Sequence, residues 1–355
     1  MRFTPVILSL LSLSLFTLTG CEGLLTAPAP GGETTGSKDQ STSDITDPAK
    51  PTTTFMYVMN GVGKTIDEIN LKTMGVTRNI MQTGLWPNQL LTQGVVTYLV
   101  NSGDHDIRKL DLRARSTLDT IALANGSNPT TISMYGEGKA LITNNVTADL
   151  AFVDLASRTT EASLKLTKGA PFFEPAIVNG KAYVPADKWA DDWSALEFSA
   201  IYVVDLATRT IVKTIELNAD ANPGNVSVDP AGKLWVGVKT GLVTIDPATD
   251  ETIGSIEFGE KVGWVQYVSE TKAYGSVSGG LVSFNPSTRE ILKSGADKIA
   301  VAEAGAFKIF QGAAYVTSFK NDTVTVVDLA IQAASGSPIP VGDGPQDLTF
   351  VTVED

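Results

Sequence analysis

A repeated pair of short apolar strands dominates the sequence from residue 55 to the C-terminus. In each copy, an apolar strand usually led by an aromatic residue is followed about ten residues later by a second one that ends in Asp or Asn and a tight turn. The first strands begin at Tyr57, Tyr98, Leu141, Tyr183, Trp235, Tyr274 and Tyr315. The turn residues are Asn70, Asp111, Asp154, Asp205, Asp246, Asn285 and Asp328. Seven copies spaced by about 40 to 50 residues have the period of a four-stranded propeller blade.

Each copy can be divided into four strands. In the copy that contains Trp235, the expected strands are 223–228, 233–238, 242–245 and 251–258. The segment Asp246-Pro247-Ala248-Thr249 suits a turn because an Asx side chain caps backbone amides two residues further on. Such sheets stack against one another as propeller blades.

The two ends of the repeat region complete each other. Counted within a four-stranded blade, the region starts with a strand that takes the second place, Phe55 to Met59. It finishes with a strand that takes the first place, Leu348 to Val351. We therefore predict an all-β fold over residues 55–355, a seven-bladed β-propeller of four-stranded antiparallel blades closed by the C-terminal strand. Rings of six or eight blades are the alternatives. A single closed ring is expected to be monomeric.

Charge and residue counts exclude several classes of function. Lys and Arg number 27 against 39 Asp and Glu, a net charge of −12, which disfavours a nucleic-acid partner. Cys21 is the only cysteine and His105 the only histidine. Disulfides, Cys/His zinc sites and a thiol nucleophile are thus excluded from the repeat region, and no cofactor is expected.

The N-terminus is typical of an exported lipoprotein. Residues 1–20 read as a signal peptide with an apolar run from Val6 to Leu18. Leu18-Thr19-Gly20-Cys21 resembles a bacterial lipobox, which implies lipidation of Cys21 and anchoring to a membrane of the cell envelope. In a two-membrane bacterium Glu22 is compatible with the outer membrane. Residues 21–54 form a tether rich in Thr, Ser, Pro and Gly. An ordinary signal peptide is the alternative.

The repeats resemble those of the YVTN-repeat propellers, a group of secreted and surface proteins of bacteria. The resemblance rests on Tyr57 to Asn60, Tyr98 to Asn101, Tyr315 to Thr317 and the segment from Val203 to Thr210. Trp235 and Gly275 depart from the motif. The resemblance implies the fold, whereas enzymes, binding proteins and scaffolds all share such folds.

Candidate catalytic groups are few. His105 lies in the polar loop 101–106 among turn-forming residues, and we interpret it as a solvated loop residue rather than a general base. The segment from Asp229 to Val236 resembles the blades of streptogramin-lyase-type propellers. That family uses a catalytic histidine with a bound metal, and no histidine follows this segment. The chain is therefore not expected to be an enzyme.

Oxygen ligands for a metal occur in two clusters. Asp187, Asp191 and Asp192 form one, and Asn218, Asp220 and Asn222 form the other. Calcium accepts such ligands, but neither cluster matches a twelve-residue calcium loop. We interpret both as solvated polar residues, and no metal is expected.

One copy carries an insertion. Between Ala186 and Asp205 the fourth copy is longer than the others, and the additional residues lie within 187–198. Trp189, Trp193 and Leu196 have the spacing of one apolar face on a short helix. The tryptophans either pack down as a satellite core or form a lid over the ring.

The register places the insertion and the loops that link the blades on one face. Aromatic and amide side chains that meet on a concave face favour a large, partly apolar ligand. The candidate ligand-binding residues are Trp86, Asn88, Phe172, Trp189, Trp193, Trp264 and Gln346.

The leading functional hypothesis is a lipid-anchored propeller of the cell envelope that binds a ligand or partner on this face without catalysis. By resemblance it looks like surface lipoprotein propellers that capture corrinoids, although no motif identifies that ligand. A protein-interaction or adhesion scaffold is the alternative, and a lyase-like enzyme is the third hypothesis.

Replacing the lipidation site tests the anchoring hypothesis. Because Cys21 is the only cysteine and the tether has no other membrane affinity, Cys21→Ser should release soluble protein. Detergent partition of the wild type and the variant measures this, and membrane retention of the variant would refute the hypothesis.

Overall fold

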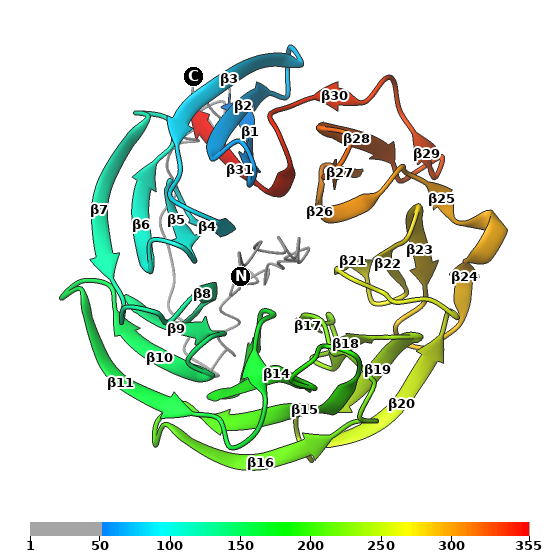
Figure 1. The fold of residues 1–355 in the computed structure, drawn as a ribbon. Helices are drawn as coiled ribbons and strands as arrows, with labels where there is room; N and C mark the ends of the chain where they lie inside the picture. The colour runs from blue at the N-terminus through cyan, green and yellow to red at the C-terminus, as the bar shows by residue number, and fades with distance from the viewer. Residues whose placement is uncertain (1–51, 355) are drawn as a thin grey trace, which may run out of the picture.

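Seven antiparallel sheets form a closed ring in the computed structural model, which describes residues 52–354 (Figure 1). The predicted fold class is therefore confirmed. We number the blades in chain order and their strands outward from the axis. Blade one contains β31 (Pro345–Glu354), β1 (Thr52–Asn60), β2 (Thr65–Asn70) and β3 (Gly75–Gln82). Blade two contains β4 (Pro87–Gln93), β5 (Val96–Asn101), β6 (Asp106–Asp111) and β7 (Ser116–Ala122). Blade three contains β8 (Pro129–Gly136), β9 (Lys139–Asn144), β10 (Asp149–Asp154) and β11 (Thr159–Lys165).

The other four blades vary this plan. Blade four contains β12 (Ala170–Pro171), β13 (Ala176–Val178), β14 (Lys181–Trp189), β15 (Leu196–Asp205) and β16 (Thr210–Glu216). Blade five contains β17 (Val226–Val228), β18 (Leu234–Val238), β19 (Gly241–Asp246) and β20 (Glu251–Glu257). Blade six contains β21 (Val265–Ser269), β22 (Lys272–Val277), β23 (Gly280–Phe284), β24 (Ile291–Lys293) and β25 (Ile299–Ala300). Blade seven contains β26 (Ala304–Phe310), β27 (Ala313–Ser318), β28 (Thr323–Asp328), β29 (Ala333–Ala334) and β30 (Ile339–Pro340).

Helix is almost absent from this part of the chain. The short 3-10 helix η1 (Gly295–Asp297) is the one helix among the described residues. Within 52–354 no helix has the length and apolar character needed to cross a membrane. The predicted signal peptide, the lipidation site Cys21 and nearly all of the tether lie outside the described residues.

The predicted turns close the third strand of each blade. Asp205 Oδ1 accepts a hydrogen bond of 2.7 Å from the backbone amide of Thr208, and Asp246 Oδ1 accepts one of 2.9 Å from that of Ala248. The same kind of bond occurs at the other five turn residues, Asn70, Asp111, Asp154, Asn285 and Asp328. The repeated acid or amide is therefore a turn cap, which explains its recurrence without a ligand.

The core is divided among the boundaries between blades. Seven clusters of buried side chains each draw on two adjacent blades, as Trp264 of blade six does with Phe307 of blade seven. Second strands such as β5 and β18 are buried on both faces because a blade packs on either side, so they read as continuous apolar runs.

The repeated tyrosine of the second strand also links neighbouring blades. The Tyr57 hydroxyl donates to Glu68 Oε2 at 2.9 Å, and Arg113 from the outer turn of blade two donates to the same oxygen at 2.7 Å. Burial raises the pKa of Tyr57, so the hydroxyl remains a donor. In blade four the Tyr183 hydroxyl donates directly to Asp250 of blade five, which also pairs with Lys181 at 2.6 Å.

Ring closure depends on β31, the innermost strand of blade one. It pairs along β1, from Val58 opposite Leu348 to Thr52 opposite Glu354. The buried Asp347 Oδ2 accepts a bond of 2.9 Å from the Leu90 amide of blade two. Its Oδ1 lies 3.6 Å from Lys308 Nζ of blade seven. Burial raises the pKa of Asp347 and lowers that of Lys308 to about 8, while each charge opposes the shift of the other. One strand thus joins three blades.

Removal of β31 should open the ring. A chain truncated after Asp343 loses the buried Leu348 and Val351 together with the Asp347 contacts, so we expect a loss of several kcal/mol in the free energy of unfolding, roughly 3 to 5 or more. Thermal and urea unfolding measure the change. A chain that ends at Val353 is the control. A truncated chain that melts within a degree or two of the full-length chain would show that closure does not depend on this strand.

Candidate functional site

Two sets of loops share one face of the ring, which we call the hairpin face. It consists of the loops between second and third strands and the loops that link successive blades. The two sets are hydrogen-bonded to each other, for example Ser102 N to Trp86 O at 2.9 Å and Asn145 N to Asn128 O at 3.1 Å. In blade five Lys239 N donates to Ala221 O at 2.8 Å. The predicted register of the repeat is therefore correct.

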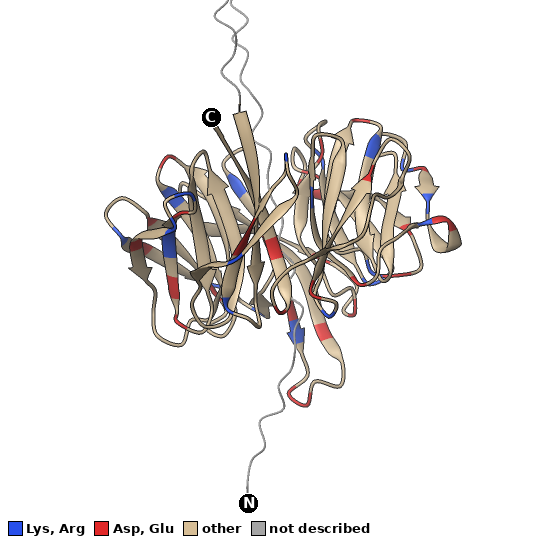
Figure 2. Cartoon of the chain, turned by 90° about the horizontal axis from the view of Figure 1, so that it is seen from above, with Lys and Arg blue, Asp and Glu red and all other residues tan. Residues whose placement is uncertain are grey.

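The insertion of blade four forms a strand extension, so the predicted short helix is wrong. β14 and β15 continue past the body of the ring, pairing Asp187 with Ser199, Lys188 with Phe198 and Trp189 with Leu196. Extending an existing ladder adds backbone hydrogen bonds at once, whereas a helix of a few residues must first be nucleated. In Figure 2 one hairpin with an acidic tip projects from one side of the ring, opposite the C-terminal end.

Local hydrogen bonds fix the tip of this insertion hairpin. Ala190 N donates to Ala195 O, and Trp193 N donates to Ala190 O, each at 2.8 Å. The Asp192 carboxylate accepts from the backbone amide and the hydroxyl of Ser194 at 3.0 and 2.6 Å. Trp193 adopts a left-handed conformation with φ of 61°. The tip therefore holds a defined shape.

Two tryptophans lie together on the insertion hairpin. The ring centroids of Trp189 and Trp193 are 6.2 Å apart with an interplanar angle of 33°. Trp193 is 58% exposed, whereas Trp189 is partly buried. For Trp193 the satellite-core hypothesis is therefore wrong, because a core side chain would have lost nearly all of its exposed surface.

Aromatic side chains also surround the root of the hairpin. β12 pairs with β14 there, with Ala170 opposite Asp187 and Pro171 opposite Ala186. The partly buried Phe172 follows, and its ring contacts Phe173 edge-on at 5.0 Å between centroids. Phe172 therefore lies next to the strand pair at the root of the hairpin, on the same part of the face as Trp189 and Trp193.

Lys261 and Asp187 add two opposite charges at the same place. Lys261 comes from the loop that links blades five and six, and its Nζ donates to Asn222 Oδ1 at 2.9 Å. The same Nζ lies 5.2 Å from the centroid of the Phe173 ring. Burial raises the pKa of Asp187 to about 6 and lowers that of Lys261 to about 8, each shift being opposed by the other charge. Asp187 is therefore not the solvated acid that we expected.

Sequence analysis did not find Lys261 as a site residue. It lies between Glu260 and Val262 in a linking loop, and Asn222 is far from it along the chain. No spacing in the sequence signals that the two loops meet across blade five.

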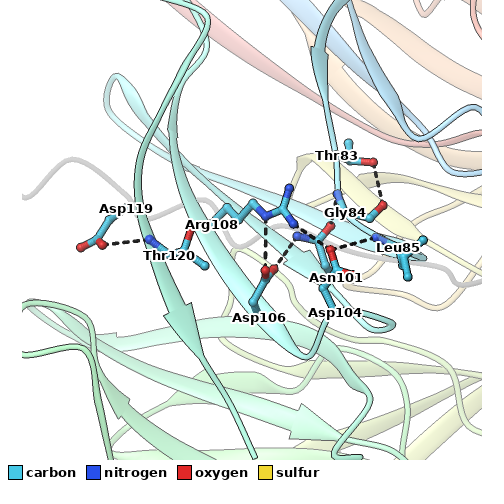
Figure 3. A network of polar contacts seen from close by, with 9 residues as sticks. All are labelled: Thr83, Gly84, Leu85, Asn101, Asp104, Asp106, Arg108, Asp119 and Thr120. Atoms are coloured by element: carbon cyan, nitrogen blue, oxygen red, sulfur yellow. Dashed lines mark hydrogen bonds and ion pairs between the residues drawn. The ribbon is translucent and has the colours of Figure 1, made fainter. Parts of the chain in front are cut away.

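Trp86 occupies the hairpin face in another part of the ring, on the loop that leads into blade two. It is 67% exposed. Figure 3 shows the network behind this loop: Asn101 Oδ1 accepts from Gly84 N at 2.9 Å, and Asp104 accepts from Leu85 N at 3.2 Å. A Cβ on Gly84 would lie only 2.6 Å from Cγ of the fully buried Asn101, so a larger residue there would displace the Asn101 side chain. Asn101, which ends the repeated apolar strand motif of blade two, therefore anchors the loop that leads into this blade.

Asn88 and Gln346 meet, but as parts of the framework. Gln346 Nε2 donates to Asn88 Oδ1 at 3.1 Å, which joins blade one to blade two. Asn88 is 9% exposed, and its Nδ2 donates to Ser102 Oγ and to Pro129 O. Because these partners occupy the Asn88 amide, the structure gives it a bridging role between blades that sequence reasoning did not predict.

Trp264 does not face solvent, so it does not line the face on which we placed it as a candidate ligand-binding residue. It is 1% exposed and packs with Tyr274 and Phe307 between blades six and seven. The place of Trp264 in a linking loop does not decide where its side chain points, because the next residue already belongs to β21, the innermost strand of blade six.

His105 and members of the two oxygen clusters make local contacts in the loops of the hairpin face. The partly buried His105 accepts a hydrogen bond at Nδ1 from Asn128 N at 3.3 Å. Asp191 and Asp192 are exposed as expected, and Asp220 pairs with Lys239 at 2.8 Å. No group of three or more His, Cys, Asp or Glu residues within 52–354 is placed to hold a metal ion.

Comparison with known proteins finds similarity of fold. No family model matches the chain, and no curated protein sequence matches it. A solved structure of a putative 6-phosphogluconolactonase from Bacteroides uniformis has a TM-score of 0.64 and 16% identity, covering 84% of this chain and 99% of that one. Apo AztD from Citrobacter koseri has a TM-score of 0.56 and 11% identity, covering 85% and 99%. The dihydro-heme d1 dehydrogenase NirN in complex with DHE has a TM-score of 0.56 and 10% identity, covering 83% and 74%. At these identities the similarity establishes one thing: the chain is a seven-bladed β-propeller.

Proposed function

We propose that this chain is a lipid-anchored propeller of the cell envelope that binds a ligand or partner on the hairpin face without catalysis. The observation that carries the proposal is the ordered insertion hairpin, which holds Trp193 in contact with Trp189 while leaving it 58% exposed. A large aromatic side chain that a protein holds in place and exposes is typical of a binding hot spot.

The position of the chain ends supports this choice of face. Thr52, the first described residue, pairs with Glu354 at the end of the ring opposite the insertion hairpin. A tether from Cys21 would reach the ring on that opposite side. The hairpin face is therefore not the face at which the described chain begins, and attachment through the tether would leave it free for a ligand.

The comparisons agree with a binding role by analogy alone. The NirN structure is a complex with DHE, so at least one protein that contains a similar fold binds a ligand. A protein partner docking on the insertion hairpin is the second candidate. The exposed tip favours it, because Trp193 projects from the ring instead of lining an enclosed site.

Trp193→Ala separates binding from structural roles. We expect the variant to keep the melting temperature of the wild type and to bind its ligand at least about 2 kcal/mol more weakly, roughly thirtyfold. A side chain buried in a core would instead cost about 3 to 5 kcal/mol of stability on truncation. Val95→Ala is the control, since Val95 is 62% exposed in a loop on the opposite face.

The measurement is native mass spectrometry of the purified protein, first with a low-molecular-weight extract and then with a solubilised protein extract of its host's envelope. Cyanocobalamin is a second probe, chosen because of the resemblance to corrinoid-capturing propellers. An adduct present with the wild type and Val95→Ala but lost with Trp193→Ala supports a small ligand. A Trp193-dependent complex with an envelope protein supports the scaffold alternative. Binding that survives Trp193→Ala would contradict this use of the hairpin face.

A further inference from the structure

Two opposite charges lie at the root of the insertion hairpin without an ion pair between them. Asp187 stands on β14 beside β12, and Lys261 reaches toward it across the loop that contains Asn222. The two groups influence each other electrostatically, yet within residues 52–354 their charged atoms are not in contact. The Lys261 ammonium is held instead by the Asn222 amide oxygen and the face of the Phe173 ring.

The described residues supply the Asp187 carboxylate with no hydrogen-bond donor. Burial and the charge of Lys261 are the two influences on it in this part of the chain. Other carboxylates on the same face are paired, as Glu303 is with Lys320 and Asp220 with Lys239. The Asp187 carboxylate is partly buried and poorly solvated, so a cationic ligand group that pairs with it would recover part of the desolvation cost.

A ligand that pairs with each of the two charges would stabilise both. A bound cation or N–H donor would complete the coordination of Asp187, while a carboxylate or carbonyl oxygen would accept from Lys261. The Phe173 ring lies against Lys261 and contacts the Phe172 ring, and β14 continues from Asp187 to Trp189. Apolar surface and two opposite charges therefore converge at one end of the hairpin.

We propose that Asp187 and Lys261 are the polar anchors of a site for a small zwitterion that carries an aromatic or similarly flat apolar group. The ligand ammonium binds Asp187, its carboxylate binds Lys261, and its apolar group packs against the aromatic side chains at the hairpin root. This inference rests on the proposed function, because it specifies the ligand class of the same face.

Three probes with one ring and different charges test the proposal. L-Phenylalanine carries both charges, 3-phenylpropanoate the negative charge alone, and 2-phenylethylamine the positive charge alone. Isothermal titration calorimetry with the full-length protein should give an affinity for L-phenylalanine at least about tenfold higher than for either analogue. Equal affinity for the three probes, or no binding of L-phenylalanine, would overturn the proposal.

Single substitutions assign each anchor. Asp187→Asn should abolish the preference for L-phenylalanine over 3-phenylpropanoate, and Lys261→Met should abolish the preference over 2-phenylethylamine. Lys320→Met is the matched control, because Lys320 is an exposed lysine on the same face in blade seven and should leave both preferences unchanged. Preferences that persist in both anchor variants would also overturn the proposal.

Melting temperatures and the Trp193-dependent adduct described above keep failure of the anchor assignment distinct from failure of the proposed function. Melting temperatures establish that each variant is folded, and Asp187→Asn is close to isosteric. If the Trp193-dependent adduct forms but the zwitterion preference is absent, the proposed function stands and the anchor assignment fails. If neither appears, the proposed function fails as well.

Discussion

The pairing of β31 with β1 is the interaction on which the rest of the structure depends. A propeller blade cannot bury both of its faces alone, so each blade needs a neighbour on either side. The boundary between blades seven and one exists only because the last strand of the chain completes the first blade, where Leu348 packs with Met56 and Val324. Asp347 strengthens this closure by accepting a backbone hydrogen bond from blade two.

Closure also gives the hairpin face its geometry. Because the ring is fixed at every boundary, loops from different blades are held at constant positions, and Lys261 of one linking loop can reach Asn222 of another. The insertion hairpin is an extension of two strands within this frame, so its tip inherits the rigidity of blade four. Exposed aromatic side chains on such a support lose little conformational entropy on binding, which suits a recognition surface.

The repeated residues serve the frame, and the irregular ones mark the candidate site. Turn caps such as Asp205, the blade-linking Tyr57 and the loop-anchoring Asn101 all have structural partners. Asp187, Lys261 and Trp193 belong to no repeated pattern: burial shifts the pKa of the first two, and the third is exposed on an ordered hairpin tip. This division is why the repeat identified the architecture but said little about the ligand.

The sequence by itself determined the seven blades, the strand that closes the ring and the face that carries the insertion, because strand periodicity and turn chemistry are local properties that recur along the chain. Only the tertiary structure decided that the insertion is a hairpin, that Trp264 is buried and that Asn88 bridges blades. It alone brought Lys261 toward Asp187. These features depend on which surfaces meet when the ring closes, and contacts between residues distant in sequence leave no local pattern.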